Sequence, residues 1–139
     1  MADLTQNAAN VNASNLAEIR KEFPAGGTIT GGNLVYLDSN NRWVQYDSNA
    51  GASIGGNVAD KRGIALHNAT NLQPLAVAVA DPNFGLGATL TNGTTYYGSP
   101  NAGAITADVP ASGNTPVFVG LAISTTRINL QPVAPGIAV

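Results

Sequence analysis

Short apolar runs alternate with turn-forming residues along most of this chain. From Phe23 onward these runs are rich in β-branched and aromatic residues, which is typical of strands: LVYL, RWVQY, GIAL, LAVAV, TTYY, VFVGLAI and RINLQPV. Between them stand Gly-Gly, Ser-Asn-Asn, Asp-Pro-Asn and Asn-Gly, which favour turns. A strand and turn every 8–12 residues or so is common in barrels and sandwiches. The pattern predicts an all-β domain over residues 23–139.

The first 22 residues have a different pattern. Leu16, Ile19 and Phe23 follow one another at helical spacing, and Ser14 precedes them as a candidate N-cap. We therefore expect an N-terminal arm, residues 1–22, that contains a short helix over residues 16–22. A helix of this length is marginal in water. The arm must therefore pack on its own domain or on a neighbouring molecule, and the sequence leaves both open.

The chain also repeats itself. At an offset of 61 residues, polar and aromatic positions recur in the same order: Thr28 and Thr89, Gly32 and Gly93, Tyr36 and Tyr97, Asp47 and Asp108. Two further matches follow at slightly shorter offsets: GIAL from Gly63 with GLAI from Gly120, and LQPLA from Leu72 with LQPVA from Leu130. We expect two similar four-strand halves, about residues 26–80 and 86–139, that form one small closed barrel or sandwich, since closure removes exposed strand edges.

The apolar positions of the strands also give an expected core. It consists of Tyr36, Trp43, Val77, Val79, Phe118, Val119 and Ile123. We expect Tyr36 and Trp43 to form a cross-strand pair in the hairpin of residues 34–46.

Charge is scarce in this sequence. Charged residues make up 10 %, against about 25 % in an ordinary soluble domain, and the mean hydropathy is +0.05. Such a surface is poorly protected from association, which suggests that other subunits cover part of it. A net charge of −2 without a basic cluster gives no reason to expect nucleic-acid binding. No secretory signal or membrane-spanning run is apparent, so we expect no membrane partner and a start in the cytoplasm.

The sequence offers little for catalysis. GASIG, with Ser53 at its centre, matches the pattern of a nucleophile elbow, but no helix is predicted after it, and His67 is the sole histidine. The chain has no cysteine, and its eight carboxylates are scattered, so we expect no metal site and no cofactor. Most Asp residues adjoin turns, where the side chain bonds nearby backbone. We expect a non-enzymatic protein.

Aromatic side chains provide an alternative function. Sugar rings stack on flat aromatic platforms, and candidates for one are Tyr36, Trp43, Tyr46, Tyr96 and Tyr97. The alternative is therefore a carbohydrate-binding β module of a tail or fibre. Adjacent tyrosines on one strand point to opposite faces, which limits the size of such a platform.

Several segments together resemble the small head decoration (cement) proteins of tailed bacteriophages. They are Thr28–Trp43, Arg62–Leu66, Ala76–Ala78, Gly87–Tyr97 and Val119–Thr125. The resemblance implies a β-rich structural virion protein, a homotrimer or less often a homodimer, on the outer surface of the capsid. There it would clamp neighbouring major capsid subunits and stabilise the mature head. Its location would be the virion, after assembly in the host cytoplasm.

Within that resemblance, the apolar residues of the arm and of the uncharged C-terminal tail are the candidate capsid contacts. They are Leu4, Val11, Leu16, Ile19, Phe23, Ile137 and Val139. The expected partners are the major capsid protein and further copies of the chain. Several weak contacts on one rigid oligomer would then add up through effective concentration.

Overall fold

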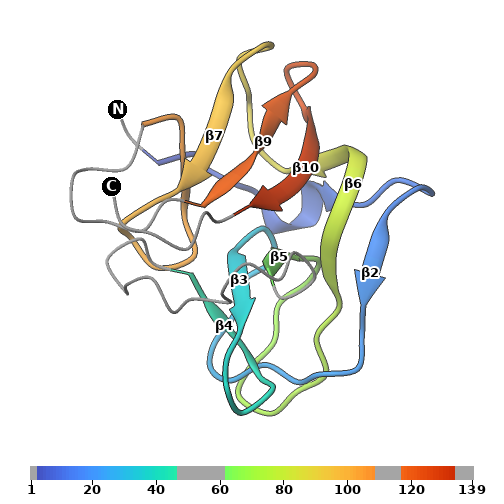
Figure 1. Ribbon diagram of the computed structural model, residues 1–139, viewed down its shortest axis with the longest axis vertical. Coiled ribbons are helices and arrows are strands. Elements are labelled where there is room, and N and C mark those ends of the chain that lie inside the picture. Colours follow the sequence, from blue (N-terminus) through green and yellow to red (C-terminus); the bar gives the residue numbers. More distant parts are fainter. Residues whose placement is uncertain (1–2, 47–61, 109–116, 134–139) are drawn as a thin grey trace.

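The computed structural model describes residues 3–46, 62–108 and 117–133 (Figure 1). The described part is nearly all β, as the sequence predicts, with one short 3₁₀ helix, η1 (Ala8–Asn10). Its strands are β1 (Val11–Asn12), β2 (Glu18–Arg20), β3 (Leu34–Leu37), β4 (Trp43–Gln45), β5 (Arg62–Ala65), β6 (Val77–Leu86), β7 (Thr95–Gly98), β8 (Ile105–Thr106), β9 (Phe118–Ala122) and β10 (Arg127–Val133).

The strands form one curled antiparallel sheet that makes a half-barrel. Its order is β4-β3-β5-β6-β10-β9-β7-β8, and β1 and β2 both pair with the long strand β6. The order is palindromic, because β4-β3-β5-β6 and β8-β7-β9-β10 are the same arrangement read from the two ends. The two sets of four strands therefore pair in the same order. Within the described ranges β4 and β8 do not pair with each other, so a closed barrel is not confirmed.

Equivalent hydrogen bonds occur in the two halves. Gly32 N–H donates to Ala65 O at 2.8 Å, and its counterpart Gly93 N–H donates to Ala122 O at 2.8 Å. Both glycines have a positive φ, +95° and +83°, at the third position of a four-residue turn. Glycine adopts this conformation without steric cost, which explains why both turns carry it.

The strand register also repeats. Val35 on β3 lies opposite Gly63 on β5, and the equivalent residues Tyr96 and Gly120 lie opposite each other on β7 and β9. From β3 to β5 and from β7 to β9, residues that align in the sequence repeat therefore occupy equivalent positions in the structure.

The segments LQPLA and LQPVA match in sequence but do not occupy equivalent positions in the structure. Leu72 lies in the loop before β6, in a left-handed conformation with φ +68°, whereas Leu130 lies within β10 opposite Gly120. Ile128 of β10 pairs with Ala122, and Val77 of β6 pairs with the equivalent residue, Ala65. Val77 is therefore the structural equivalent of Ile128. The loop between β5 and β6 is longer than that between β9 and β10, and this displaces the motif from its apparent partner.

The predicted helix over residues 16–22 is wrong. Ser14 does start a turn, since its Oγ accepts from Leu16 N–H at 3.2 Å and its carbonyl from Ala17 N–H. The chain then forms β2, in which Ile19 lies opposite Ala78 of β6. Pairing with β6 gives these backbone groups partners that a short helix would supply only in part.

The arm is tied to the body at further points. Asp81 on β6 is buried, and its carboxylate accepts from Ser14 N–H at 2.7 Å and from Ser14 Oγ–H. Gln6 donates from Nε2 to Gly32 O at 2.9 Å and to Leu86 O at 3.0 Å. In the single chain, these contacts pack the arm on its own domain.

The apolar residues form two clusters. The shared core joins both halves and contains Val11, Leu34, Tyr46, Ile64, Ala78, Phe84, Leu86, Leu90, Tyr96, Ile105, Val117, Val119, Ala122, Ile128 and Leu130. The outer core covers the opposite face of the first half and contains Ala25, Ile29, Val35, Leu37, Trp43, Ala65, Ala69, Leu75, Val77 and Val79.

Four of the predicted core residues are buried: Trp43, Val77, Val79 and Val119. Tyr36 and Phe118 are partly buried. The prediction for Ile123 is wrong: it is 44 % exposed, because it belongs to the turn after β9, where its N–H donates to Arg127 O. The hairpin of β3 and β4 forms as expected, but Tyr36 pairs with Val44, and Trp43 pairs with Leu37.

Candidate functional site

The arm residues expected to contact the capsid fall into two groups. Val11 is buried in the shared core, and Leu4 and Phe23 are partly buried against the two cores. Leu16 is 68 % exposed and Ile19 is also exposed. Only these last two side chains are therefore open to a partner.

Besides Asp47 of the repeat, three residues considered for a functional site lie outside the described residues. They are Ser53 of the GASIG motif and the tail residues Ile137 and Val139.

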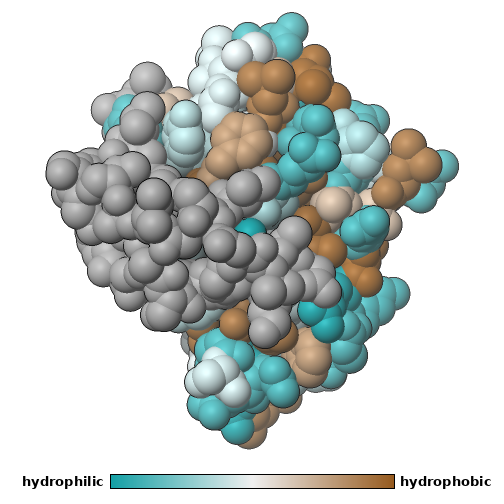
Figure 2. Space-filling view, in the orientation of Figure 1, coloured by the Kyte–Doolittle hydropathy of each residue, from teal (hydrophilic) through white to brown (hydrophobic). Residues whose placement is uncertain are grey.

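A second exposed apolar surface lies on β9. Leu121 is 42 % exposed, between Thr95 of β7 and Asn129 of β10. Further along the strands, the rings of Tyr97 and Phe118 meet edge to face at 6.4 Å between centroids. In Figure 2, apolar atoms appear at the surface in the region of β7 and β9, at the top of the view. We call Tyr97, Phe118, Leu121 and Ile123 the β9 face.

The β9 face is open because the two halves turn opposite faces toward the shared core. In the second half, Tyr96 and Ala122 point into the shared core. Their equivalents in the first half, Val35 and Ala65, point into the outer core instead. The same strand unit thus occurs twice, but opposite faces of its sheet meet the shared core. This leaves Leu121 on the outside.

A polar pocket is formed where three strands meet. Asn12 on β1 and Arg127 on β10 both lie directly opposite Gly85 on β6. A side chain at Gly85 would place its Cβ 2.9 Å from Asn12 Oδ1 and 3.0 Å from Arg127 Nη1. The amide of Asn12 and the guanidinium group of Arg127 therefore both reach into the space that a side chain at Gly85 would fill.

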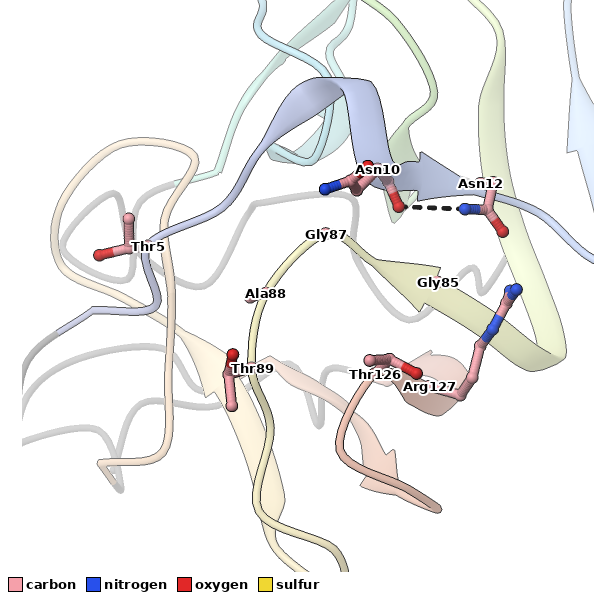
Figure 3. Close-up of a pocket in the computed structure, with 9 residues that line it drawn as sticks. All are labelled: Thr5, Asn10, Asn12, Gly85, Gly87, Ala88, Thr89, Thr126 and Arg127. Atoms are coloured by element: carbon pink, nitrogen blue, oxygen red, sulfur yellow. Dashed lines mark hydrogen bonds between the residues drawn. The ribbon is translucent and has the colours of Figure 1, made fainter.

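Gly85, Asn12 and Arg127 line a pocket of about 370 Å³. Figure 3 shows its polar side chains arranged around the segment from Gly85 to Thr89, with Asn10 and Asn12 on one side and Thr126 and Arg127 on the other. Asn12 Nδ2 donates to Asn10 O at 3.0 Å, which fixes the amide. The sequence alone does not reveal this pocket, because its residues come from three segments that are far apart in the chain.

Local hydrogen bonds position the pocket residues. Ser124 Oγ accepts from the N–H groups of Thr126 at 3.2 Å and Arg127 at 3.0 Å, which shapes the turn that carries both side chains. Arg127 Nη1 donates to Asn83 O at 3.2 Å. Asn7 Oδ1 caps η1 by accepting from Ala9 N–H at 3.1 Å.

A second hollow of about 300 Å³ lies at the corresponding place in the first half. Thr28 lines it, as the equivalent Thr89 lines the first pocket. Ile29 N–H donates to Ala69 O there, and its counterpart Leu90 N–H donates to Thr125 O. The described lining of the second hollow includes Thr70 and Gln73 and contains no charged residue.

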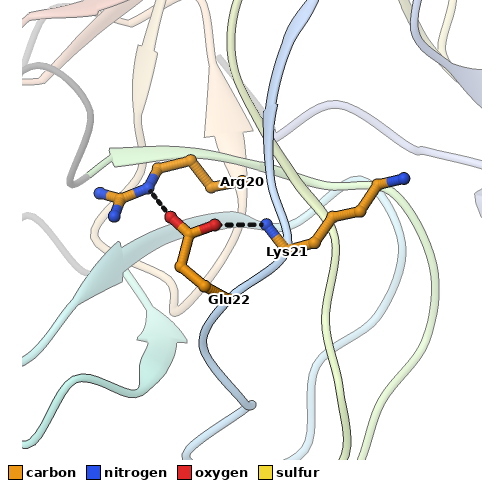
Figure 4. A network of polar contacts seen from close by, with 3 residues as sticks. All are labelled: Arg20, Lys21 and Glu22. Atoms are coloured by element: carbon orange, nitrogen blue, oxygen red, sulfur yellow. Dashed lines mark hydrogen bonds and ion pairs between the residues drawn. The ribbon is translucent and has the colours of Figure 1, made fainter.

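The end of the arm carries a small charged network (Figure 4). Arg20 Nε donates to Glu22 Oε1, and Lys21 N–H donates to Glu22 Oε2 at 3.1 Å. The hydrogen bond from Arg20 is the main reason that the pKa of Glu22 is lowered from 4.5. The Arg20 guanidinium also lies 5.1 Å from the ring centroid of Phe23, a cation–π contact that holds the end of the arm.

The ring of His67 is engaged by backbone. Nδ1 is 3.0 Å from Asn68 O, and Nε2 accepts from Ala76 N–H at 3.1 Å. These partners assign Nδ1 as the protonated nitrogen. Through them, His67 links the two ends of the loop between β5 and β6. In residues 3–46, 62–108 and 117–133, no three or more His, Cys, Asp or Glu side chains gather in a way that would hold a metal ion.

The aromatic side chains do not form an open platform. Trp43, Tyr46 and Tyr96 are buried, and the hydroxyl of Tyr96 accepts from Thr91 N–H at 3.0 Å. Tyr36 and Tyr97 are partly buried. The stacking surface expected for a carbohydrate-binding module is thus not made by these five residues.

The described ranges contain no helix long and apolar enough to cross a bilayer. No family model matches the sequence, and no curated protein sequence matches it either.

Proposed function

We propose that this chain is a structural protein of a phage virion that binds the outer surface of the head and stabilises it by clamping neighbouring major capsid subunits. The observation that carries the proposal is the distribution of exposed apolar side chains. Leu16 and Ile19 lie at the arm, and Leu121 lies on a separate sheet face. Two such surfaces on a rigid, low-charge scaffold suit a protein that contacts several neighbours at once.

The two surfaces have different roles in this proposal. Leu16 and Ile19, at the end of a segment tied to β6, contact the major capsid protein. The β9 face contacts a second copy of the chain and so builds the homotrimer, or alternatively a homodimer. The partly apolar outer surface of β7, β9 and β10 is suited to an interface between copies.

Binding of variants to isolated heads tests this assignment. The double variant Leu16→Ser/Ile19→Ser loses head binding while its oligomeric state is unchanged, and Leu121→Ser loses the oligomer. Leu72→Ser is the matched control, because Leu72 is equally apolar and exposed but belongs to neither surface. Bound protein is measured after sedimentation of the heads, and oligomeric state by analytical ultracentrifugation. Normal decoration by the double variant would contradict the assignment.

A further inference from the structure

We propose that the pocket over Gly85 binds a polyhydroxylated ligand with a single carboxylate, of the uronic-acid class. This proposal is independent of capsid binding. It rests on the three-strand arrangement in which Asn12 and Arg127 flank a glycine.

The charge of the pocket defines the charge of the ligand. Among the described residues that line the pocket, Arg127 is the one that carries a charge. Its guanidinium donates to Asn83 O from Nη1, and no carboxylate in residues 3–46, 62–108 or 117–133 is paired with it. A guanidinium group matches a carboxylate in a two-point contact, so one negative charge is the natural complement.

The remaining lining defines the rest of the ligand. Asn10, Asn12, Thr89 and Thr126 contribute amides and hydroxyls. These groups both donate and accept, as sugar hydroxyls do, whereas an inorganic anion uses donors alone. The volume of about 370 Å³ lies near the lower end of the usual range for small-molecule sites.

Glycine is required at the floor of this pocket. A Cβ at Gly85 would approach Asn12 Oδ1 to 2.9 Å. At Gly87, φ is +75° and a Cβ would lie 2.6 Å from Asn7 O. Both glycines therefore let the arm and the Arg127 side chain lie close to β6.

The test is a titration of the isotopically labelled full chain with sodium glucuronate. Binding is measured from the change in the amide NMR shifts. We expect saturable shifts at Gly85, Gly87 and Thr126, with much smaller effects of glucose, acetate or inorganic phosphate at equal concentration and ionic strength. Arg127→Gln weakens glucuronate binding about tenfold or more, as expected for loss of a hydrogen bond to a charged group.

Two further variants make the result decisive. Thr126→Ala removes a pocket hydroxyl without removing charge and weakens binding severalfold, even if Arg127→Gln fails to fold. Thr70→Ala, in the second hollow, leaves binding unchanged. Absence of shifts, equal shifts with glucose, acetate or phosphate, or an equal effect of Thr70→Ala would overturn the proposal.

Discussion

Ile64 and Leu121 occupy equivalent positions in the two halves of the protein, yet Ile64 is fully buried and Leu121 is 42 % exposed. Each lies in the middle strand of its unit, opposite residues of the two flanking strands. The neighbours of Ile64 are Leu34 and Ala78, and those of Leu121 are the polar Thr95 and Asn129. The duplicated unit has therefore become asymmetric: one copy closes the core and the other presents a face.

This asymmetry predicts different costs for equivalent substitutions. Ile64→Ala lowers the free energy of unfolding by about 2–5 kcal/mol, because it leaves a cavity in the shared core. Leu121→Ala changes it by about 0.5 kcal/mol or less in the monomer, because the side chain faces solvent. Urea unfolding at low protein concentration measures both. Equal losses would contradict the reversed burial of the two halves.

The paired glycines of β5 and β9 predict a second effect. A Cβ at Gly63 would lie 2.3 Å from Ala78 O, and one at Gly120 would lie 2.1 Å from Asn129 O. Both contacts are with backbone, so Gly63→Ala and Gly120→Ala each cost about 1–3 kcal/mol through displacement of a strand. Gly27→Ala is the control, since nothing lies within 4 Å of its Cβ position. If Gly27→Ala lowered the free energy of unfolding as much as the other two substitutions, this explanation would be contradicted.

Asp81 holds the arm to β6. Asp81→Ala leaves the N–H groups of Ser14 and Asn83 without their acceptor. We expect the free energy of unfolding to fall by about 1–3 kcal/mol. Amide hydrogen exchange in β1 and β2 should accelerate more than in β3 and β4. Asp38→Ala, which removes the acceptor of an exposed turn, should have a smaller effect because water can replace it. Uniform acceleration throughout the sheet would contradict a specific role of Asp81 in anchoring the arm.

The network at the end of the arm predicts a pH dependence. The pKa of Glu22 lies below 4.5 in the folded protein, mainly because Arg20 donates to its carboxylate. The resulting small stabilisation is present above the pKa of the unfolded chain and is lost as the pH falls through the folded value. NMR titration of the Glu22 carboxyl measures that value directly. Arg20→Gln should raise it, whereas Lys21→Gln should leave it nearly unchanged, because Lys21 contributes its backbone N–H.

The sequence predicted what depends on local pattern. The segments LVYL and TTYY gave β3 and β7, and the glycines at positions 32 and 93 marked the turns before them. These features follow from turn chemistry and β-propensity, which neighbouring residues determine. The strand halves could be predicted for the same reason.

Tertiary pairing decided the rest. The spacing of Leu16, Ile19 and Phe23 fits a helix, but the free edge of β6 gave the arm a strand partner. Ile123 is exposed because β9 ends at Ala122 and Ile123 lies in the turn that follows, and the repeat alone does not determine where the strand ends. The pocket over Gly85 arises from the register of β1, β6 and β10, which no local pattern encodes.

The most direct test of the proposed function is sedimentation of the purified chain with empty expanded heads and with unexpanded procapsids of the phage that encodes it. The proposed function predicts saturable binding to expanded heads, at a fixed ratio to the major capsid protein, and a rise in the temperature at which those heads break open. Absence of binding to either particle would contradict it.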